Sequence, residues 1–538
     1  MLPACLALLL APWLVLTAPP ARADLSAEID FHIGPQPLAT ALTAFADATH
    51  IQVVTAAADL GALRSPGVMR RTTAAQALAD LLQGTPLSFQ RVGLDTVVIV
   101  AAADPPATEA AIADIGQLDD VLIIGRGYTR ASSTVTPQDA PARAPGAPVQ
   151  SYLEDLPGIN VQNSDPYGLY EFGNSVRIRG FSNDQIGISL DGVPLESYDV
   201  RDGSPPGRFV DAEDLSSVTV AQGSGDVMMP SYHALGGSVR YFTGEPSGSW
   251  GATLSSVAGD NQLSRIYARL DTPAWWSGGP IAAASVSRTR AVQFDNHSAT
   301  MDVDHAMLKL REDFDGGSAV LTYRYGDRDD HDMQNYDARG RVASWFDLLE
   351  TPTGDPERDA LYYRYWTNGR TDQLLSLQLR AEPWTGWKFE LLPYYERKRG
   401  YGYAGVAPSA AEAQYAAAIA DDGGVPGRTD IEPYDGTGIA ERRESLRGER
   451  RGATLGLSTE WGRHAISAGG WYERYGFAQD RPLYNVDDDD RIETGALPIV
   501  SYYDRHFDTQ VAQYYLKDSS RWLAQRLRID IGLKGLYV

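Results

Sequence analysis

The chain has 538 residues with 47 basic and 70 acidic side chains, and its formal net charge of −23 argues against a nucleic-acid partner. Beyond the N-terminal segment, no run reaches the roughly 18–20 apolar residues that a membrane-spanning helix requires. Any membrane insertion must therefore use β-strands, whose two faces alternate in polarity.

The first 23 residues have the features of an export signal. Leu6–Leu16 is an apolar core, and Ala21–Ala23 has the small-x-small form of a cleavage site, although the usual basic region is missing. A short membrane anchor is the alternative interpretation. The lone cysteine, Cys5, lies within this segment, so a mature chain beginning at Asp24 would form no disulfide and have no thiol chemistry.

Residues 24–101 are predicted to form a compact α/β domain. One helix is expected after Pro37, and a second after the capping-box pattern Thr73–Gln76, ending at Gly84. Strands are predicted at Ile29–Ile33, Ile51–Val54, Leu87–Val92 and Thr96–Val100.

This region resembles the short N-terminal domain shared by secretins and TonB-dependent receptors. The resemblance is carried by QPLATALTAFADATHIQVV and TTAAQALADLLQGTPLSF, which together span most of the domain. It implies a periplasmic domain of the transducer subclass, which reports ligand occupancy to an anti-sigma regulator. A periplasmic module without signalling is the alternative.

Residues 102–128 are predicted to be a linker that is rich in alanine, proline and acidic residues. Near its end an acidic pair precedes a β-branched run, a pattern suited to pairing with the edge of a partner's sheet. By position and pattern this run resembles the TonB box, and the first strand of the next domain is the alternative. The residues expected to bind TonB are Asp119, Asp120, Val121, Leu122, Ile123 and Ile124.

Residues 129–245 contain the most informative stretch, NSVRIRGFSNDQIGISLDGVPL, at positions 174–195. Two short alternating strands are predicted there, and Asp191-Gly192 supplies turn chemistry after the second. The stretch resembles the plug domain of TonB-dependent outer-membrane receptors. Further elements that resemble the plug, in the same order, are Leu156–Val161, Leu215–Val220 and Ala234–Val239, whereas Thr129–Gln150 is expected to be irregular.

The resemblance also suggests which plug residues act. Residues expected to have structural roles are Arg177, Gly180, Asp191, Gly192, Gly236 and Gly237. Those proposed to contact a ligand at the plug apex are Arg179, Tyr198, Tyr167, Tyr170 and Arg201. Buried ion pairs between plug and barrel are the alternative role of Arg177 and Arg179.

Residues 246–538 alternate apolar with charged or aromatic side chains in repeated segments, the pattern of an outer-membrane barrel. Polar stretches at Gly326–Asp372 and Tyr401–Gly448 are expected to be long loops. About eleven strands are predicted, roughly half of the 22 strands of the large plugged transporters. The chain ends at Val538 within a predicted strand, so a truncated receptor is expected, with completion of the wall by other chains as the alternative.

The predicted fold is mainly β: an α/β signalling domain, an α+β plug and a partial transmembrane barrel. The resemblance implies a receptor in the cell outer membrane, with residues 24–101 in the periplasm, that takes up a ferric siderophore with energy delivered by TonB. Carbohydrate, haem and cobalamin are alternative ligands, and a sensor without transport or a non-functional truncated receptor are alternative fates. No catalytic motif is found, so we expect no enzyme activity, no cofactor and no bound metal.

Overall fold

The computed structural model describes residues 28–49, 52–55, 63–85, 87–91, 96–101, 132–136, 147–154, 156–195, 204–223, 226–232, 234–293, 298–332, 348–421, 432–436, 438–486, 492, 495–522 and 527–538. The predicted signal segment, the linker with its TonB box at 119–124, and the proposed ligand residues Tyr198 and Arg201 lie outside the described residues. The chain divides into two compact units, Met1–Val121 and Leu122–Val538.

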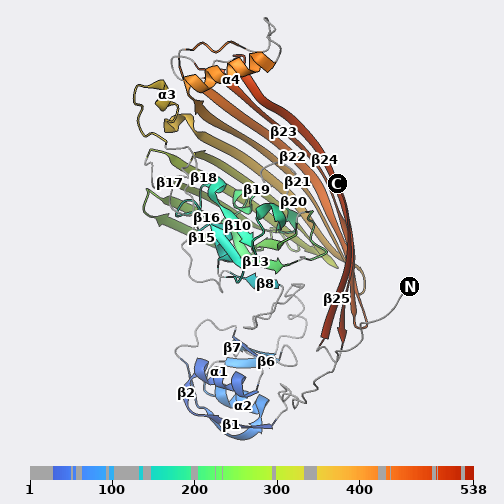
Figure 1. Ribbon diagram of the computed structural model, residues 1–538. Helices are drawn as coiled ribbons and strands as arrows, with labels where there is room; N and C mark the ends of the chain where they lie inside the picture. Colours follow the sequence, from blue (N-terminus) through green and yellow to red (C-terminus); the bar gives the residue numbers. More distant parts are fainter. Residues whose placement is uncertain are drawn as a thin grey trace, which may run out of the picture. The chain divides into compact units, whose positions relative to one another are not determined.

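The first unit is a small α/β structure in which two helices accompany short strands (Figure 1). Its elements are β1 (Glu28–Ile33), β2 (Gln36–Pro37), α1 (Leu38–Thr49), β3 (Gln52–Thr55), β4 (Arg64–Ser65), β5 (Val68–Thr73), α2 (Ala74–Leu82), β6 (Leu87–Arg91) and β7 (Thr96–Ala101). Strands pair in the orders β1-β5, β2-β4 and β3-β7-β6. Both helices and all four strands predicted from the sequence are present.

The interior of this unit follows from helical periodicity. Leu38, Phe45 and Leu78 are completely buried, and the ring of Phe45 stacks on that of Phe31 with centroids 5.7 Å apart. The side chain of Thr73 accepts a hydrogen bond from the Gln76 backbone and so caps α2, as the sequence pattern predicts. Strand β5 was not predicted, because Arg70 and Arg71 interrupt its alternation and only pairing with β1 defines it.

The second unit begins with the segment that we call the plug, residues 132–243. Its elements are β8 (Ser132–Val135), η2 (Val149–Leu153), β9 (Ile159–Gln162), η3 (Glu171–Gly173), β10 (Ser175–Ile178), η4 (Asn183–Gln185), β11 (Ile186–Leu190), β12 (Val193–Pro194), η5 (Pro206–Arg208), η6 (Ala212–Asp214), β13 (Leu215–Gln222) and β14 (Gly237–Thr243). A five-stranded mixed sheet has the order β12-β11-β14-β13-β8, and β9 pairs with β10. The prediction that residues 129–150 are irregular is wrong at β8, whose small polar residues pair with β13.

Turn chemistry shapes the plug as the sequence indicates. Asp191 and Gly192 both have positive φ, 47° and 84°, and they close a two-residue hairpin between β11 and β12. At Gly237, φ is 134° and an added Cβ would lie 2.3 Å from the Ala221 carbonyl oxygen, so only glycine fits. A Cβ on Gly236 would collide with Phe181.

The rest of the second unit is one antiparallel sheet of eleven strands, which we call the wall. Its strands are β15 (Gly251–Ala258), β16 (Ser264–Thr272), β17 (Ile281–Val292), β18 (Thr300–Phe314), β19 (Gly317–His331), β20 (Thr367–Trp384), β21 (Trp387–Val406), β22 (Ala440–Trp461), β23 (His464–Asn485), β24 (Val500–Trp522) and β25 (Leu527–Tyr537). The long connections of the wall carry α3 (Pro356–Asp359), η7 (Tyr363–Tyr365) and α4 (Pro408–Asp421).

The wall is curved, and the plug lies on its concave side (Figure 1). The apolar core of the plug continues into the wall through Leu374, Leu392 and Tyr394. Strands pair in chain order from β15 to β25, and among the described residues these two edge strands do not pair, so the sheet is open. No helix in the described part of the chain has the length and apolar character needed to cross a membrane.

All eleven predicted wall strands are present, and those from β17 to β24 are longer than expected. Strands β19, β20, β21 and β22 extend into the stretches that were predicted to be loops. The ends of β19, β20 and β22 carry charged residues and the end of β21 carries glycines, so they lack the apolar alternation on which the prediction relied. Backbone pairing with neighbouring strands continues regardless of side-chain polarity.

Candidate ligand-binding site

One buried carboxylate shapes the segment of the plug that faces the loop end of the wall. Asp165 accepts hydrogen bonds from the backbone amides of Tyr167, Leu169 and Tyr170, at 2.9, 3.1 and 2.9 Å. The Tyr167 hydroxyl donates to the Asp260 carbonyl at 2.6 Å, and the Tyr170 hydroxyl donates to Asp332 at 2.9 Å. The two predicted tyrosines are therefore brought together and tied to the wall.

Beside this segment lies a small cavity of about 170 Å³, which we call the outer basin. Residues from the plug and from the loop ends of β20–β23 line it: Tyr170, Phe172, Asp332, Asn368, Gly402, Tyr403, Arg442, Glu444 and Arg481. The Phe172 side chain is 40% exposed and meets the Tyr170 ring edge to face, with centroids 5.6 Å apart. Arg481 pairs with Glu444, whose other carboxylate oxygen accepts from Gln479. The basin thus combines aromatic rings with two guanidinium groups.

A buried ion pair lies beneath the basin. Arg208 donates two hydrogen bonds to the Glu171 carboxylate, at 2.8 and 2.6 Å, and both side chains are more than 90% buried. Burial raises the pKa of Glu171, but the charges of Arg208 and Arg328 and the hydrogen bond from Arg208 together outweigh it and hold that pKa well below its usual range. Arg328 donates to the Leu169 carbonyl and so fixes the same segment from β19.

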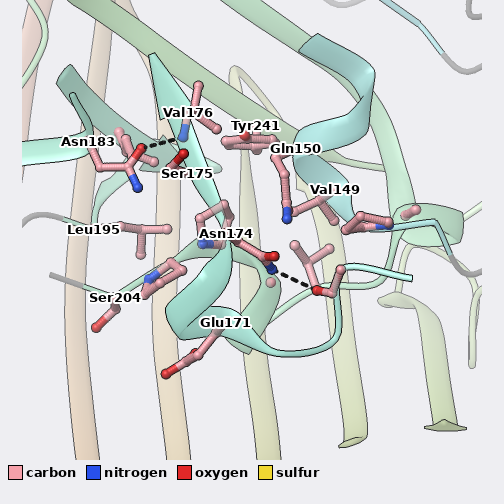
Figure 2. Close-up of a pocket in the computed structure, with 18 of the residues that line it drawn as sticks. Val149, Gln150, Glu171, Asn174, Ser175, Val176, Asn183, Leu195, Ser204 and Tyr241 are labelled. Carbon is pink, nitrogen blue, oxygen red and sulfur yellow. Dashed lines mark hydrogen bonds between the residues drawn. The ribbon is translucent and has the colours of Figure 1, made fainter. Parts of the chain in front are cut away.

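On the inner side of this pair is a larger cavity of about 630 Å³, which we call the inner cavity. Figure 2 shows side chains from several plug elements around it, including Gln150, Asn174, Asn183 and Tyr241. Asn183 accepts from the Val176 amide at 3.0 Å, and Asn174 donates to the Gly168 carbonyl at 2.7 Å. The Asn174 Oδ1 atom is buried without a hydrogen-bond partner among the described residues, so it can accept a bond from a guest molecule.

Glu171 and Arg328 line the inner cavity and also a narrow space next to the outer basin. Glu171 therefore lies between the inner cavity and this narrow space, and Arg208 holds its carboxylate in place.

Charged residues of the wall hold the plug at three further places. Arg450 pairs with Glu396 and Glu473 at 2.9 Å each and also donates to the Pro194 carbonyl of the plug. All three side chains of this triad are at most 1% exposed.

At the second place, Asp191 of the plug turn faces Arg324 and Lys309 of the wall. Burial opposes ionisation of Asp191, but the two cations lower its pKa to about 2. At the third, Arg265 pairs with Asp211 and Glu213 at 2.9 and 2.8 Å.

Predicted plug residues have different positions. Tyr167 and Tyr170 lie at the loop end, and Tyr170 lines the outer basin, whereas Arg179 lines none of the three cavities described above. The alternative role of Arg177 and Arg179 in buried ion pairs is wrong, because both side chains are exposed. Arg179 instead has positive φ, 52°, next to Gly180 at 89°, so the two form a turn.

The sequence analysis missed Phe172, Asn368, Arg442 and Arg481. Asn368 and Arg442 lie within segments expected to be loops, and Arg481 lies beyond the end of the strand predicted at Ala465–Tyr475, so none of the three was placed on a strand. One signal was available: Arg442 and Glu444 are two residues apart, which places both on one face of a strand.

The comparisons with known proteins agree with this geometry. Residues 126–238 match the family model of the TonB-dependent receptor plug domain. The ferric-pyoverdine M114 receptor PbuA of Pseudomonas sp. (strain M114) is 26% identical over 292 residues, which cover 49% of this chain and 32% of that receptor. The chain therefore matches about a third of the length of this curated relative.

Solved structures show the same fold at low identity. The ferripyoverdine receptor of the outer membrane of Pseudomonas aeruginosa, bound to ferripyoverdine, matches with a TM-score of 0.54 and 17% identity, covering 95% of this chain and 65% of that one. The unliganded ferric citrate transporter FecA matches with a TM-score of 0.52 and 14% identity, covering 76% and 59%.

The outward face of the wall suits a lipid environment. Leu254, Ile266, Val286 and Leu516 are more than half exposed there, on strands at both ends of the sheet. Residues 126–238 belong to the TonB-dependent receptor plug-domain family, and the eleven strands of wall that follow share the fold of the solved outer-membrane receptor.

Proposed function

We propose that this protein binds a ferric siderophore in the outer basin and admits it across the outer membrane by TonB-driven movement of the plug. The observation that carries the proposal is the basin itself, where Arg442, Arg481 and the exposed ring of Phe172 converge above the plug. Ferric chelates with carboxylate or catecholate groups are anionic, and guanidinium groups recognise such groups well. The matched relatives named for ferric-pyoverdine and ferric citrate support this ligand class.

The contacts between plug and wall favour passage of the ligand by movement of the plug rather than through a permanent opening. The Glu171–Arg208 pair and the Arg450 triad are ionic and buried, so they specify one docked position of the plug. Buried ion pairs contribute less net free energy than their Coulomb attraction suggests, because desolvation opposes it. We propose that TonB pairs with Asp119–Ile124 as an added strand. The force that it then exerts on the plug breaks these contacts.

We further propose that residues 24–101 report ligand occupancy to an anti-sigma regulator. The support is that this region belongs to a separate compact unit with its own buried core, and its pattern resembles a signalling domain. Deleting residues 28–101 should abolish ligand-dependent expression of a sigma-controlled reporter and leave ligand uptake intact. Equal reporter induction with and without these residues would contradict the signalling role.

A binding assay tests the proposed ligand class. The purified protein is titrated with ⁵⁵Fe-labelled ferripyoverdine and ferric citrate, with haem, cobalamin and a maltodextrin as alternative ligands. The double variant Arg442→Gln/Arg481→Gln should bind the ferric chelate at least about tenfold more weakly, because two charge-assisted contacts are lost.

The matched control is Arg474→Gln, which removes an exposed arginine from the opposite face of β23. Its affinity should equal that of the unmodified protein. Tight binding of haem, cobalamin or maltodextrin without binding of either ferric chelate would reject the siderophore proposal. Uptake in cells carrying a deletion of Asp119–Ile124 should be lost while binding persists.

A further inference from the structure

The outward face of the wall carries a group of arginines that the proposed function does not use. In an antiparallel sheet, residues in register share a face and successive residues alternate. Arg450 points to the plug, so Arg451 faces away from it, together with its register partners Tyr395 and Arg474. The same parity places Arg399 and Arg447 on the outward face.

Two pairs of these arginines lie directly opposite one another across neighbouring strands. Arg399 on β21 is in register with Arg447 on β22, and Arg451 on β22 is in register with Arg474 on β23. All four are exposed. Like charges at directly opposed positions destabilise a sheet, so this arrangement favours an anion bound between them. We call these four residues the arginine belt.

Acidic neighbours neutralise only part of the belt. Arg474 pairs with Asp508, whereas no ion pair or hydrogen bond within the described part of the chain involves Arg399 or Arg447. Glu449, the outward residue between Arg447 and Arg451, lies 3.9 Å from Arg397 on β21. The belt therefore keeps a net positive charge.

Elsewhere on the same outward face the arginines are matched by acids. Arg288 and Arg290 on β17 are in register with Asp304 and Asp302 on β18, and each ion pair measures 3.4 Å. These two arginines are 59% and 53% exposed, comparable with Arg474 at 46%. Both groups are therefore exposed to a similar degree, and among the described residues of this face arginines stand directly opposite one another only on β21–β23.

The position of the arginine belt along the strands indicates which part of the membrane it contacts. From the short turn after Trp461, the outward residues of β22 are uncharged and, except for Thr459, apolar as far as Ala453, and charge begins at Arg451. Tyr395 and Tyr472, which are 40% and 53% exposed, lie at this boundary. An outward apolar band bounded by tyrosines marks the hydrocarbon region of a membrane and its interface.

We propose that the arginine belt binds the phosphate groups of a phosphorylated lipid headgroup in the leaflet on the long-loop side of the wall. The belt lies next to the apolar band, on the side that leads to α4 and the other long connections. A lipid could bury its chains along Leu455 and Tyr472 while its phosphates bridge the opposed guanidinium groups.

The test uses the protein purified in detergent micelles, with bis-phosphorylated lipid A as the probe. Native mass spectrometry counts bound lipid as lipid A is titrated in. The variant Arg399→Gln/Arg447→Gln should bind lipid A roughly tenfold or more weakly, and Arg399→Lys/Arg447→Lys should keep most of the affinity. The matched control Arg288→Gln/Arg290→Gln should bind as the unmodified protein does.

Two competitors separate the sources of phosphate. Dephosphorylated lipid A should bind the unmodified protein and the glutamine variant equally, and millimolar inorganic phosphate should not displace lipid A. Equal lipid A binding by all variants, or full displacement by inorganic phosphate, would overturn the proposal. If the glutamine variant does not fold, the unmodified protein alone provides the test. Raising NaCl from about 50 to 500 mM must then weaken the binding of lipid A more than the binding of its dephosphorylated form.

Discussion

The interior of the first unit and the interface between plug and wall are both buried, but the interface adds buried ion pairs to its apolar contacts. In the first unit, Phe31, Phe45 and Leu78 fill the core. Between plug and wall, Arg324 and Arg450 are fully buried among carboxylates. Apolar packing gives a unit that holds itself together, whereas paired charges specify a position that a competing force can break. This difference distinguishes the first unit, which must stay folded, from the plug, which must move relative to the wall.

The largest expected effect comes from breaking the Arg450 triad. Arg450→Gln would leave Glu396 and Glu473 buried without a compensating charge, which costs about 3–5 kcal/mol. We expect amide-exchange protection of β11 and β12 to fall sharply, because the bond to the Pro194 carbonyl is also lost.

The control for this experiment is Arg474→Gln, which removes an exposed pair with Asp508 on the opposite face. Its effect should stay below about 1 kcal/mol. Unchanged exchange in β11 and β12 of Arg450→Gln would mean that apolar contacts, not the ion pairs, hold the plug.

A cavity in the first unit should have a smaller effect that stays within that unit. Phe45→Ala removes a fully buried ring stacked on Phe31, for a loss of about 3 kcal/mol. Limited proteolysis should then cleave the first unit faster while the plug and wall stay protected. Matching loss of protection in the plug would show that the two units depend on each other for stability.

Low pH should loosen the plug through Asp191. Its pKa is about 2 when the plug is docked and about 3.9 in an unfolded chain, so its contribution is fully present above about pH 4. As the pH falls through 2 this contribution, about 2 kcal/mol, is lost. Exchange protection of β11 should fall over that window, and the slope should be shallower in Asp191→Asn. An identical slope in both proteins would assign the pH dependence to other carboxylates.

The smallest predicted effect concerns a helix cap in the first unit. Thr73→Ala removes the acceptor for the Gln76 amide and should lower the stability of α2 by about 1 kcal/mol. Thermal unfolding followed by circular dichroism should show this, and Thr73→Ser should restore most of the loss. A loss as large as that of Phe45→Ala would mean that Thr73 has a role beyond capping.

Local rules predicted the elements well and their ends poorly. All eleven wall strands were found from alternation, and the Asp191-Gly192 turn was found from its residue types. Strand ends beyond the apolar band, such as those holding Arg442 and Asn368, were taken for loops because their inward residues are polar too. The outer basin was therefore only half anticipated, through Tyr170 and not through its arginines.

The sequence by itself determined the class of fold, the order of its parts and the residues that must turn, because periodicity and backbone preferences act over a few residues. It did not determine the partners of charged side chains. Arg177 and Arg179 are exposed, whereas Arg450 is fully buried. Only the tertiary structure decides which face of a strand meets the plug and which residue stands opposite in register, because those contacts join residues that are distant along the chain.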